Sequence, residues 1–434
     1  MLQIYEITVI ILSIIIAIYS VKKSKRSNKS IYFIYLVFWF IYVLPLMCDL
    51  IIGKPNYGAR FNGFRLSYDD EYTRFFYATY ILVVQFIMLI VGNKKYVIIK
   101  SKVKYKNDRL KEIKNTEYKD NRIIENILLF FSILTVLLVI IFPVSKYILW
   151  DMSWRDSGKI IEGLNYYSTI ERFSYISIVS CIICLFNKKY SMLLKVVLLI
   201  VLYMTICSES KRSIIFFAGV ILIAYMIYNT EYKKRKNIYL LAYLGVIAAI
   251  MYSVYIKLEF RGYVNSSQLY TTMRIDFGRD DTVKLVIYSL LNPNKMKILD
   301  YPGQSIICQI GTIFPLQLLG VKSIGYNAFL TAALIGQPVE RSINWMTTSI
   351  LDETIANYGF WGFWIAPVII GLMARVTDKL TREMIPITIG AIVLLLMYPI
   401  SYIMWYLQFW LILMLIAQKC NKEIDFDKSK IDKE

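Results

Sequence analysis

Long apolar runs separated by short basic segments dominate the chain. A helix that crosses a bilayer needs ~20 mostly apolar residues, because each residue adds ~1.5 Å and the hydrocarbon core is ~30 Å thick. Eleven spans are predicted on this basis, at residues 3–21, 31–52, 75–92, 123–143, 172–187, 191–207, 213–229, 238–256, 357–374, 385–402 and 403–418. The last two runs are nearly continuous, so a tight turn is predicted near Tyr402.

The spacing of these runs predicts an all-α polytopic integral membrane protein with one long loop. Two moderately apolar stretches in that loop, 305–320 and 324–336, are broken by Gly and Pro. They are interpreted as two more spans, which would give 13, or as re-entrant or interfacial helices. The predicted regions are the first eight helices with short loops (1–256), the long loop (257–356), the C-terminal helices (357–418) and a tail (419–434).

The distribution of charge predicts the orientation of the spans. The chain is 57% hydrophobic with a formal net charge of +19, and its basic residues cluster in short loops. Such loops are typical of the cytoplasmic side of a membrane protein and not of a nucleic-acid-binding surface. Simple alternation then places the N-terminus and the long loop outside the cytoplasmic membrane and the tail inside. The cytoplasmic loops are predicted at 22–29, 93–122, 187–189, 232–236 and 375–382.

The chain contains no histidine. This absence excludes Ser-His-Asp hydrolases, histidine-dependent acyltransferases and histidine-ligated metal or haem sites. Acid–base chemistry would have to use carboxylates, Tyr, Lys or Cys. The one C-x-x-C motif, Cys181 and Cys184, lies inside an apolar run and is interpreted as two packed thiols.

The short hairpin SESKRSIIFF (208–217) breaks the expected charge pattern, because alternation places Lys211 and Arg212 outside. Charges at a membrane boundary are costly unless they are hydrated, paired or bound to a ligand. Arginine offers a planar, bidentate donor to phosphate, so outward arginines suit a lipid-linked diphosphate. The alternative is a tight hairpin in which Glu209 pairs with Arg212.

A second candidate region, ILDETIANYGFWG (350–362), runs from acidic residues directly into an apolar run. Glu353 and Asn357 are one helical turn apart, so one helix face would present a carboxylate and an amide at the membrane surface. Tyr358 equally fits an interfacial aromatic belt.

Three segments together resemble a known family. The Arg-containing start of a middle helix (SESKRSIIFF), an R-G step opening the long outer loop (EFRGY) and the acidic-to-N-Y-G-x-x-G re-entry (DETIANYGFWG) are similar to Wzy-type polymerases of bacterial surface glycans such as O-antigen or capsule. The resemblance covers roughly residues 120–400. It implies a GT-C-like fold, no metal or other cofactor, and an undecaprenyl-diphosphate-linked oligosaccharide as substrate. Membrane lipids and a chain-length regulator protein are the other partners implied.

The resemblance also implies roles for individual residues. Arg212 and Arg261 would hold the diphosphate, with Lys211 and Arg341 assisting. Glu353 is the first choice for the base that accepts the acceptor hydroxyl's proton, followed by Asp281 or Asp352. The acceptor sugar would contact Asn357, Tyr358, Arg274 and Arg279.

Three other functions are weighed against polymerisation. Related O-antigen ligases share the layout, but their outer loop carries a histidine that this chain lacks. A metal-dependent glycosyltransferase using a polyprenyl-phosphate sugar would explain the acidic SYDDEY segment (67–72). A lipid-linked oligosaccharide flippase or other transporter would be expected to show internal symmetry, which the long loop breaks.

Overall fold

The computed structural model describes most of the chain. The described residues are 1–58, 61–93, 122–141, 164–209, 212–230, 232–261, 269–271, 273–274, 278–313, 324–339, 346–379 and 383–431. Within these ranges all regular structure is helical, and none is β-strand.

Among the described residues, five helical segments are long and apolar enough to cross a membrane. The coarse prediction of a helical membrane protein therefore agrees with the structure. They are α1 (Leu2–Ser24), the continuous α2–η1–α3 (Ile31–Phe38, Trp39–Val43, Leu44–Ile52), α5 (Glu71–Asn93), α17–η6–α18 (Ile350–Tyr358, Gly359–Trp361, Gly362–Thr377) and the start of α20 (Ile400–Ile431).

Other predicted spans fall on helices whose described apolar stretches are shorter, at 10–17 residues. Length and composition of the described residues therefore do not confirm the prediction of eleven spans. These helices are α7 (Arg122–Ile141), α9 (Leu164–Leu185), α10 (Met192–Glu209), α11 (Arg212–Asn229) and α19 (Met384–Met397). The predicted 238–256 span lies within α12 (Arg235–Arg261). In the predicted long loop, α16 (Tyr326–Ile335) has ten residues and is ~15 Å long, too short to cross a bilayer by itself.

The turn predicted near Tyr402 is wrong. Helix α19 ends at Met397 and α20 begins at Ile400, so the break lies at Tyr398 and Pro399. Proline lacks a backbone N–H and disfavours helical geometry in the residue before it, which explains the position of the break.

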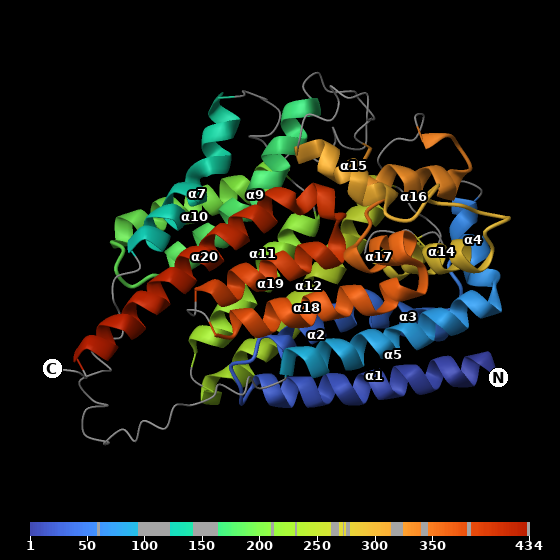
Figure 1. Ribbon diagram of the computed structural model, residues 1–434, viewed down its shortest axis with the longest axis horizontal. Coiled ribbons are helices and arrows are strands. Elements are labelled where there is room, and N and C mark those ends of the chain that lie inside the picture. Colours follow the sequence, from blue (N-terminus) through green and yellow to red (C-terminus); the bar gives the residue numbers. More distant parts are fainter. Residues whose placement is uncertain are drawn as a thin grey trace. The chain divides into compact units, whose positions relative to one another are not determined.

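The chain divides into two compact units. The first comprises Met1–Asn93, Met226–Asp378 and Ile389–Met404. In it α5 packs along both α1 and α18 (Figure 1). Glycine permits the close contact between α5 and α18, because a Cβ added at Gly371 would lie 2.9 Å from the Val91 Cβ.

Polar contacts in the first unit join segments that are predicted to lie on the same side of the membrane. The Arg235 Nη1 donates to the carbonyls of Ser24 and Ser27, both at 2.9 Å. The Asp378 Oδ1 accepts bonds from the Ser30 N at 2.8 Å and the Ser30 Oγ at 2.6 Å. These residues belong to, or adjoin, three loops predicted to be cytoplasmic. The contacts are therefore compatible with the predicted alternation of these spans.

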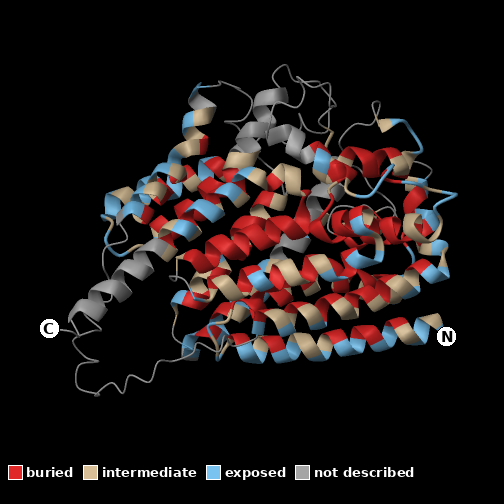
Figure 2. Cartoon of the chain, in the orientation of Figure 1, coloured by how far each residue is buried: buried red, intermediate tan, exposed pale blue. Residues whose placement is uncertain are grey.

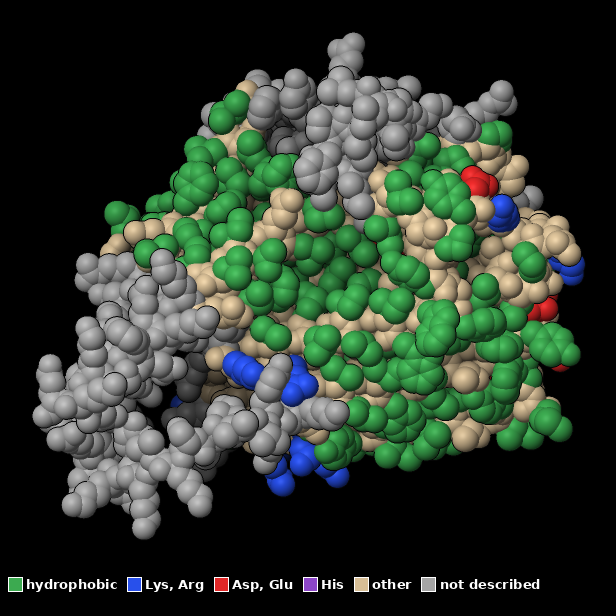
Figure 3. All heavy atoms as spheres, in the orientation of Figure 1, with side chains coloured by type: hydrophobic (Ala, Val, Ile, Leu, Met, Phe, Trp, Pro, Cys, Tyr) green, Lys and Arg blue, Asp and Glu red, His purple; other side chains and the backbone are tan. Residues whose placement is uncertain are grey.

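One face of α1 presents apolar side chains outward. The exposed side chains lie mostly three or four positions apart, and Figures 2 and 3 show this exposed, largely hydrophobic face over α1, α5 and α18. Lys22 and Lys23 occupy the last turn of α1, where basic side chains gather in Figure 3. Such a face suits contact with lipid. The exposed apolar residues of α1 include Ile4, Ile7, Ile11, Ile15 and Ile18.

The second unit comprises Lys94–Tyr225, Lys379–Thr388 and Trp405–Glu434. Its helices α7, α9 and α10 pack against one another. Ser177 of α9 ties α7 to α9, because its Oγ lies 2.8 Å from the Thr135 Oγ1 and donates to the Phe131 carbonyl at 2.8 Å. Cys181 and Cys184 are free and buried, which fits their interpretation as packed thiols.

Candidate functional site

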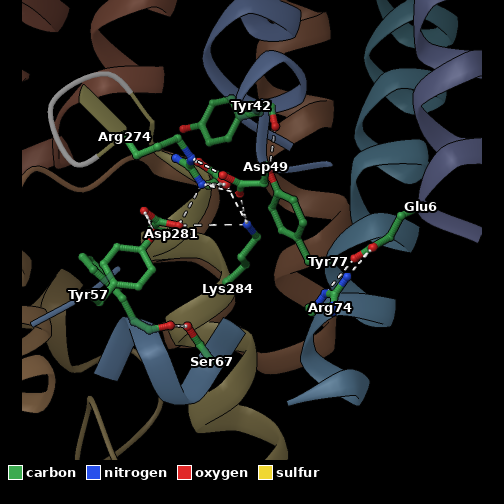
Figure 4. A network of polar contacts seen from close by, with 12 residues as sticks. Glu6, Tyr42, Asp49, Tyr57, Ser67, Arg74, Tyr77, Arg274, Asp281 and Lys284 are labelled. Carbon is green, nitrogen blue, oxygen red and sulfur yellow. Dashed lines mark hydrogen bonds and ion pairs between the residues drawn. The ribbon is translucent and has the colours of Figure 1, made fainter. Parts of the chain in front are cut away.

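A buried group of five charged residues, called here the charge cluster, lies in the first unit (Figure 4). Its acidic members are Asp49 near the end of α3, and Asp280 and Asp281 in the first turn of α14 (Asp280–Leu291). Its basic members are Arg274 and Lys284. The position of the two adjacent aspartates is favourable because the N-terminus of a helix carries partial positive charge.

Arg274 is the centre of the charge cluster. Its guanidinium forms a bidentate pair with Asp49, in which Nε donates to Oδ1 and Nη2 donates to Oδ2, both at 2.8 Å. A second such contact joins Nη1 and Nη2 to the two carboxylate oxygens of Asp280 at 2.9 and 2.8 Å. Nη2 also donates to the Asp281 Oδ1 at 3.2 Å. Gly278 permits this packing, since an added Cβ would lie 2.1 Å from the Arg274 Nη1.

Lys284 supplies the second cation. Its Nζ donates to the Asp280 Oδ2 at 2.7 Å, one helical turn earlier on α14. The same ammonium lies 5.2 Å from the ring centroid of Tyr68 and 5.0 Å from that of Tyr77. Because Lys284 is only 1% exposed, carboxylate and aromatic partners take the place of water around its charge.

Two tyrosines complete the hydrogen bonding of the acids. Tyr57 donates from its hydroxyl to the Asp281 Oδ2 at 2.6 Å, and Tyr270 donates to the Asp49 Oδ1 at 2.6 Å. The Asn56 backbone N–H donates to the Thr271 Oγ1 at 2.9 Å, so the segment that follows α3 is also attached to the residue after Tyr270.

The two neighbouring aspartates of α14 differ in acidity. Burial raises the pKa of Asp281 to about 6, and this effect outweighs the opposing influence of Arg274. Burial also disfavours the charged form of Asp280, but Arg274 and Lys284 together hold the pKa of that carboxyl below its usual value. The site therefore pairs a firmly ionised carboxylate with one that gains or loses a proton near neutrality, as acid–base sites require.

A second polar group, called here the Glu353 group, joins α17 to α15 (Gln304–Ile313). The Glu353 Oε1 accepts from the Ser305 Oγ at 3.0 Å, and its Oε2 accepts from the Ile400 backbone N at 3.1 Å. The Asn357 Nδ2 donates to the Ser305 Oγ and to the Glu353 carbonyl, both at 2.8 Å. The carboxylate thus binds a backbone N–H in the first turn of α20, a donor that has no partner within the helix, which is a capping role.

The structure places the predicted site residues in two groups. Arg274 and Asp281 belong to the charge cluster, and Arg279 directly precedes α14. Asp352, Glu353 and Asn357 are buried on α17, whereas Tyr358 is 42% exposed. Lys211, Arg341 and the side chains of Arg212 and Arg261 lie outside the described residues, although α11 begins at Arg212 and α12 ends at Arg261.

The predicted site residues did not include five that complete the site: Asp49, Asp280, Lys284, Tyr57 and Tyr270. Asp49 is a single acid inside a predicted span, which is by itself a signal for function. Lys284 follows Asp280 by four residues, a spacing that favours an ion pair on a helix. Tyr57 has no comparable signal, because nothing in the segment GKPNYG predicts which side chain turns inward.

Within the described residues no group of three or more His, Cys, Asp or Glu side chains is arranged to hold a metal ion. The chain matches no protein-family model, no curated protein and no solved structure.

Proposed function

We propose that the chain is a glycosyltransferase of the bacterial cytoplasmic membrane that polymerises lipid-linked oligosaccharide repeat units. In this proposal the growing glycan is transferred from undecaprenyl diphosphate to the non-reducing sugar of an acceptor repeat unit on the outer side. A GT-C-like bundle of about 11 spans, with the N-terminus outside and the C-terminus inside, is part of the same proposal.

The observation that carries the proposal is the charge cluster with its carboxyl of raised pKa. It lies beside the C-terminal end of α3 and contacts the segment after it, and these positions face outward in the predicted topology. Glycan transfer to a hydroxyl needs a base, and the chain has no histidine to provide it.

We assign the base to Asp281 in preference to Glu353. The pKa of Asp281, at about 6, lets it be ionised at neutral pH and still accept a proton readily. Arg274 and Tyr57 fix its two oxygens in position. The Glu353 carboxylate instead holds Ser305 and the start of α20.

The roles of the other predicted residues follow from this assignment. Arg274 contacts three carboxylates and is therefore a positioning residue rather than a sugar ligand. Binding of the diphosphate is left to Arg212 and Arg261, with Lys211 and Arg341 assisting. Arginine donors would stabilise the negative charge that develops on the departing diphosphate.

The proposal is tested with purified protein and a synthetic undecaprenyl-diphosphate-linked repeat unit in the presence of EDTA. The wild type should produce a ladder of longer glycans, and Asp281→Asn should lose about 10²–10⁴-fold in rate, the range of a general base. The matched control is Asp300→Asn, because the Asp300 side chain is 75% exposed and forms only a 3.9 Å pair with Lys297 and a 3.3 Å hydrogen bond from the Gln304 Nε2. A full ladder from Asp281→Asn would overturn the assignment of the base. The absence of any ladder from folded wild type would overturn the function.

A further inference from the structure

Asp352 is a fully buried carboxylate in the first turn of α17, within a segment long and apolar enough to span a membrane. Its Oδ1 accepts bonds from the Ser349 backbone N at 2.7 Å and from the Ser349 hydroxyl, forming a capping box. Its Oδ2 has no hydrogen-bond partner among the described residues. Capping therefore accounts for one oxygen of the carboxylate and leaves the other unexplained.

No Lys or Arg in the described part of the chain forms an ion pair with Asp352, in contrast to the aspartates of the charge cluster. The groups within electrostatic reach are instead the phenols of Tyr42, Tyr80 and Tyr326 and the neighbouring carboxylate Glu353. A buried, ionised carboxylate without a counter-charge is strongly disfavoured, and within a span it indicates a functional site.

A second observation independently indicates a missing ligand. Tyr326 of α16 is fully buried and its hydroxyl interacts with the Asp352 carboxylate, yet it makes no hydrogen bond of normal geometry within the described ranges. The hydroxyl of Thr348, just before the capping residue Ser349, is likewise buried and has no hydrogen bond there. Buried hydroxyl groups almost always have a well-formed partner, so the Tyr326 hydroxyl beside Asp352 marks a place where an additional polar species fits.

We propose that Asp352 holds an exchangeable monovalent cation, either a proton or a sodium ion, at its Oδ2, with the Tyr326 hydroxyl as the second ligand. A proton on Oδ2 would be donated to the Tyr326 oxygen, and a sodium ion would accept lone pairs from both oxygens. Either species neutralises the carboxylate and gives both atoms a partner. The site differs from the charge cluster, whose acids already have Arg274 and Lys284.

Other ionisable side chains lie around Asp352, and their protonation also changes with pH. Tyr42, Tyr80 and Tyr326 face Asp352 from η1, α5 and α16, and all are buried phenols. Glu353 lies next to it on α17, with both oxygens in hydrogen bonds. On α14, which packs against α17, the ionisable groups are those of the charge cluster, and Arg279 directly precedes that helix. Variants of Asp352 and Glu353 therefore separate this site from its neighbours.

The test measures the thermal midpoint of the purified full-length protein against NaCl and against pH, with N-methylglucamine chloride keeping the ionic strength constant. The key variant is Asp352→Asn, because its amide can still cap the helix and can donate to the Tyr326 oxygen as a protonated acid would. The matched control is Glu353→Gln, which leaves Asp352 intact.

A sodium ion predicts that the wild-type midpoint rises with Na⁺, because a ligand bound only by the folded state stabilises it. A proton predicts that the midpoint is insensitive to Na⁺ and falls as pH rises, because the folded state then loses a proton that stabilised it. Asp352→Asn should abolish a Na⁺ response, or remove from a pH response the part that Asp352 adds to that of Asp281. Glu353→Gln should retain the wild-type response.

If Asp352→Asn does not fold, Tyr326→Phe provides the second test. Loss of the hydroxyl ligand should raise the Na⁺ or proton concentration needed for half the response by about fivefold, the effect of one net hydrogen bond. Responses of Asp352→Asn identical to those of the wild type would overturn the proposal. So would a wild type that responds to neither ion. Because stability is the readout, these outcomes do not depend on glycan transfer.

Discussion

Removal of the Arg274 guanidinium should destabilise the first unit strongly and in a pH-dependent way. Arg274→Met keeps much of the apolar volume but removes five hydrogen bonds to three buried carboxylates. Lys284 then remains as the only cation of the charge cluster, facing Asp49, Asp280 and Asp281. Removing one partner of a buried ion pair typically lowers the free energy of unfolding by ~3–5 kcal/mol.

The loss of stability caused by Arg274→Met has an upper limit, because the folded protein can take up a proton instead of burying an unpaired charge. Asp280, now held in its ionised form by two cations, would be an acceptor for that proton. Protonation at pH 7 of a carboxyl whose pKa is ~3.9 in the unfolded chain costs about 4 kcal/mol, at 1.36 kcal/mol per pH unit. The same step costs only ~1.5 kcal/mol at pH 5. The deficit of Arg274→Met should therefore shrink by more than half between these two pH values.

The assay is reversible unfolding in detergent micelles at pH 7 and pH 5, with the wild type measured at the same pH values. The control is Lys297→Met, which removes an exposed cation whose pair with Asp300 is 3.9 Å long. That variant should change stability by no more than ~0.5 kcal/mol at either pH. A cost below ~1 kcal/mol for Arg274→Met, or one that does not change with pH, would refute the interpretation of the charge cluster as an interdependent ion network.

Three further predictions concern the proposed base and the helix packing. The rate of glycan transfer should rise as pH increases through about 6 and be lost below it, because Asp281 acts in its ionised form. This rise is the acidic limb of the pH–rate profile, and a profile without it would contradict the role of Asp281 as the base. Tyr57→Phe removes a donor to the ionised form and should move the limb up by about one pH unit, measured by the same profile, whereas an unshifted limb would show the bond to be unimportant. Gly362→Ala should lower stability by ~1–3 kcal/mol in thermal unfolding, since its Cβ would lie 2.3 Å from the Thr354 carbonyl oxygen, while Gly219→Ala, which meets nothing within 4 Å, should not.

The apolar runs predict the helices because the hydrophobic length of a span is encoded locally. Boundaries are predicted less well where a helix extends into polar sequence. The span predicted to begin at 357 continues a helix that starts at Ile350, because Ser349 and Asp352 form a capping box upstream of the apolar run. The predicted turn at Tyr402 failed for a related reason, since one proline, Pro399, outweighs the surrounding apolar residues.

Some contacts of the charge cluster join residues that are close in the sequence, and others join residues that are far apart. Arg274, Asp280 and Asp281 are near neighbours in the chain, so their grouping in RIDFGRDD is visible in the sequence. The contact between Arg274 and Asp49 joins residues 225 positions apart, and only the packing of α3 near α14 brings them together. The sequence likewise names Asp352 and Glu353 as adjacent acids. It does not reveal that, among the described residues, Glu353 has hydrogen bonds at both oxygens and Asp352 at only one.

The most direct test of the proposed function is the stoichiometry of a single reaction. Purified protein is supplied with a lipid-diphosphate-linked repeat unit, and the lipid diphosphate released is counted against the glycosidic bonds formed. Polymerisation predicts one released diphosphate for every bond formed, with the loss of both signals in Asp281→Asn. Movement of the intact lipid-linked unit across a vesicle membrane, with no diphosphate released and no glycan extended, would contradict the account and favour a transporter.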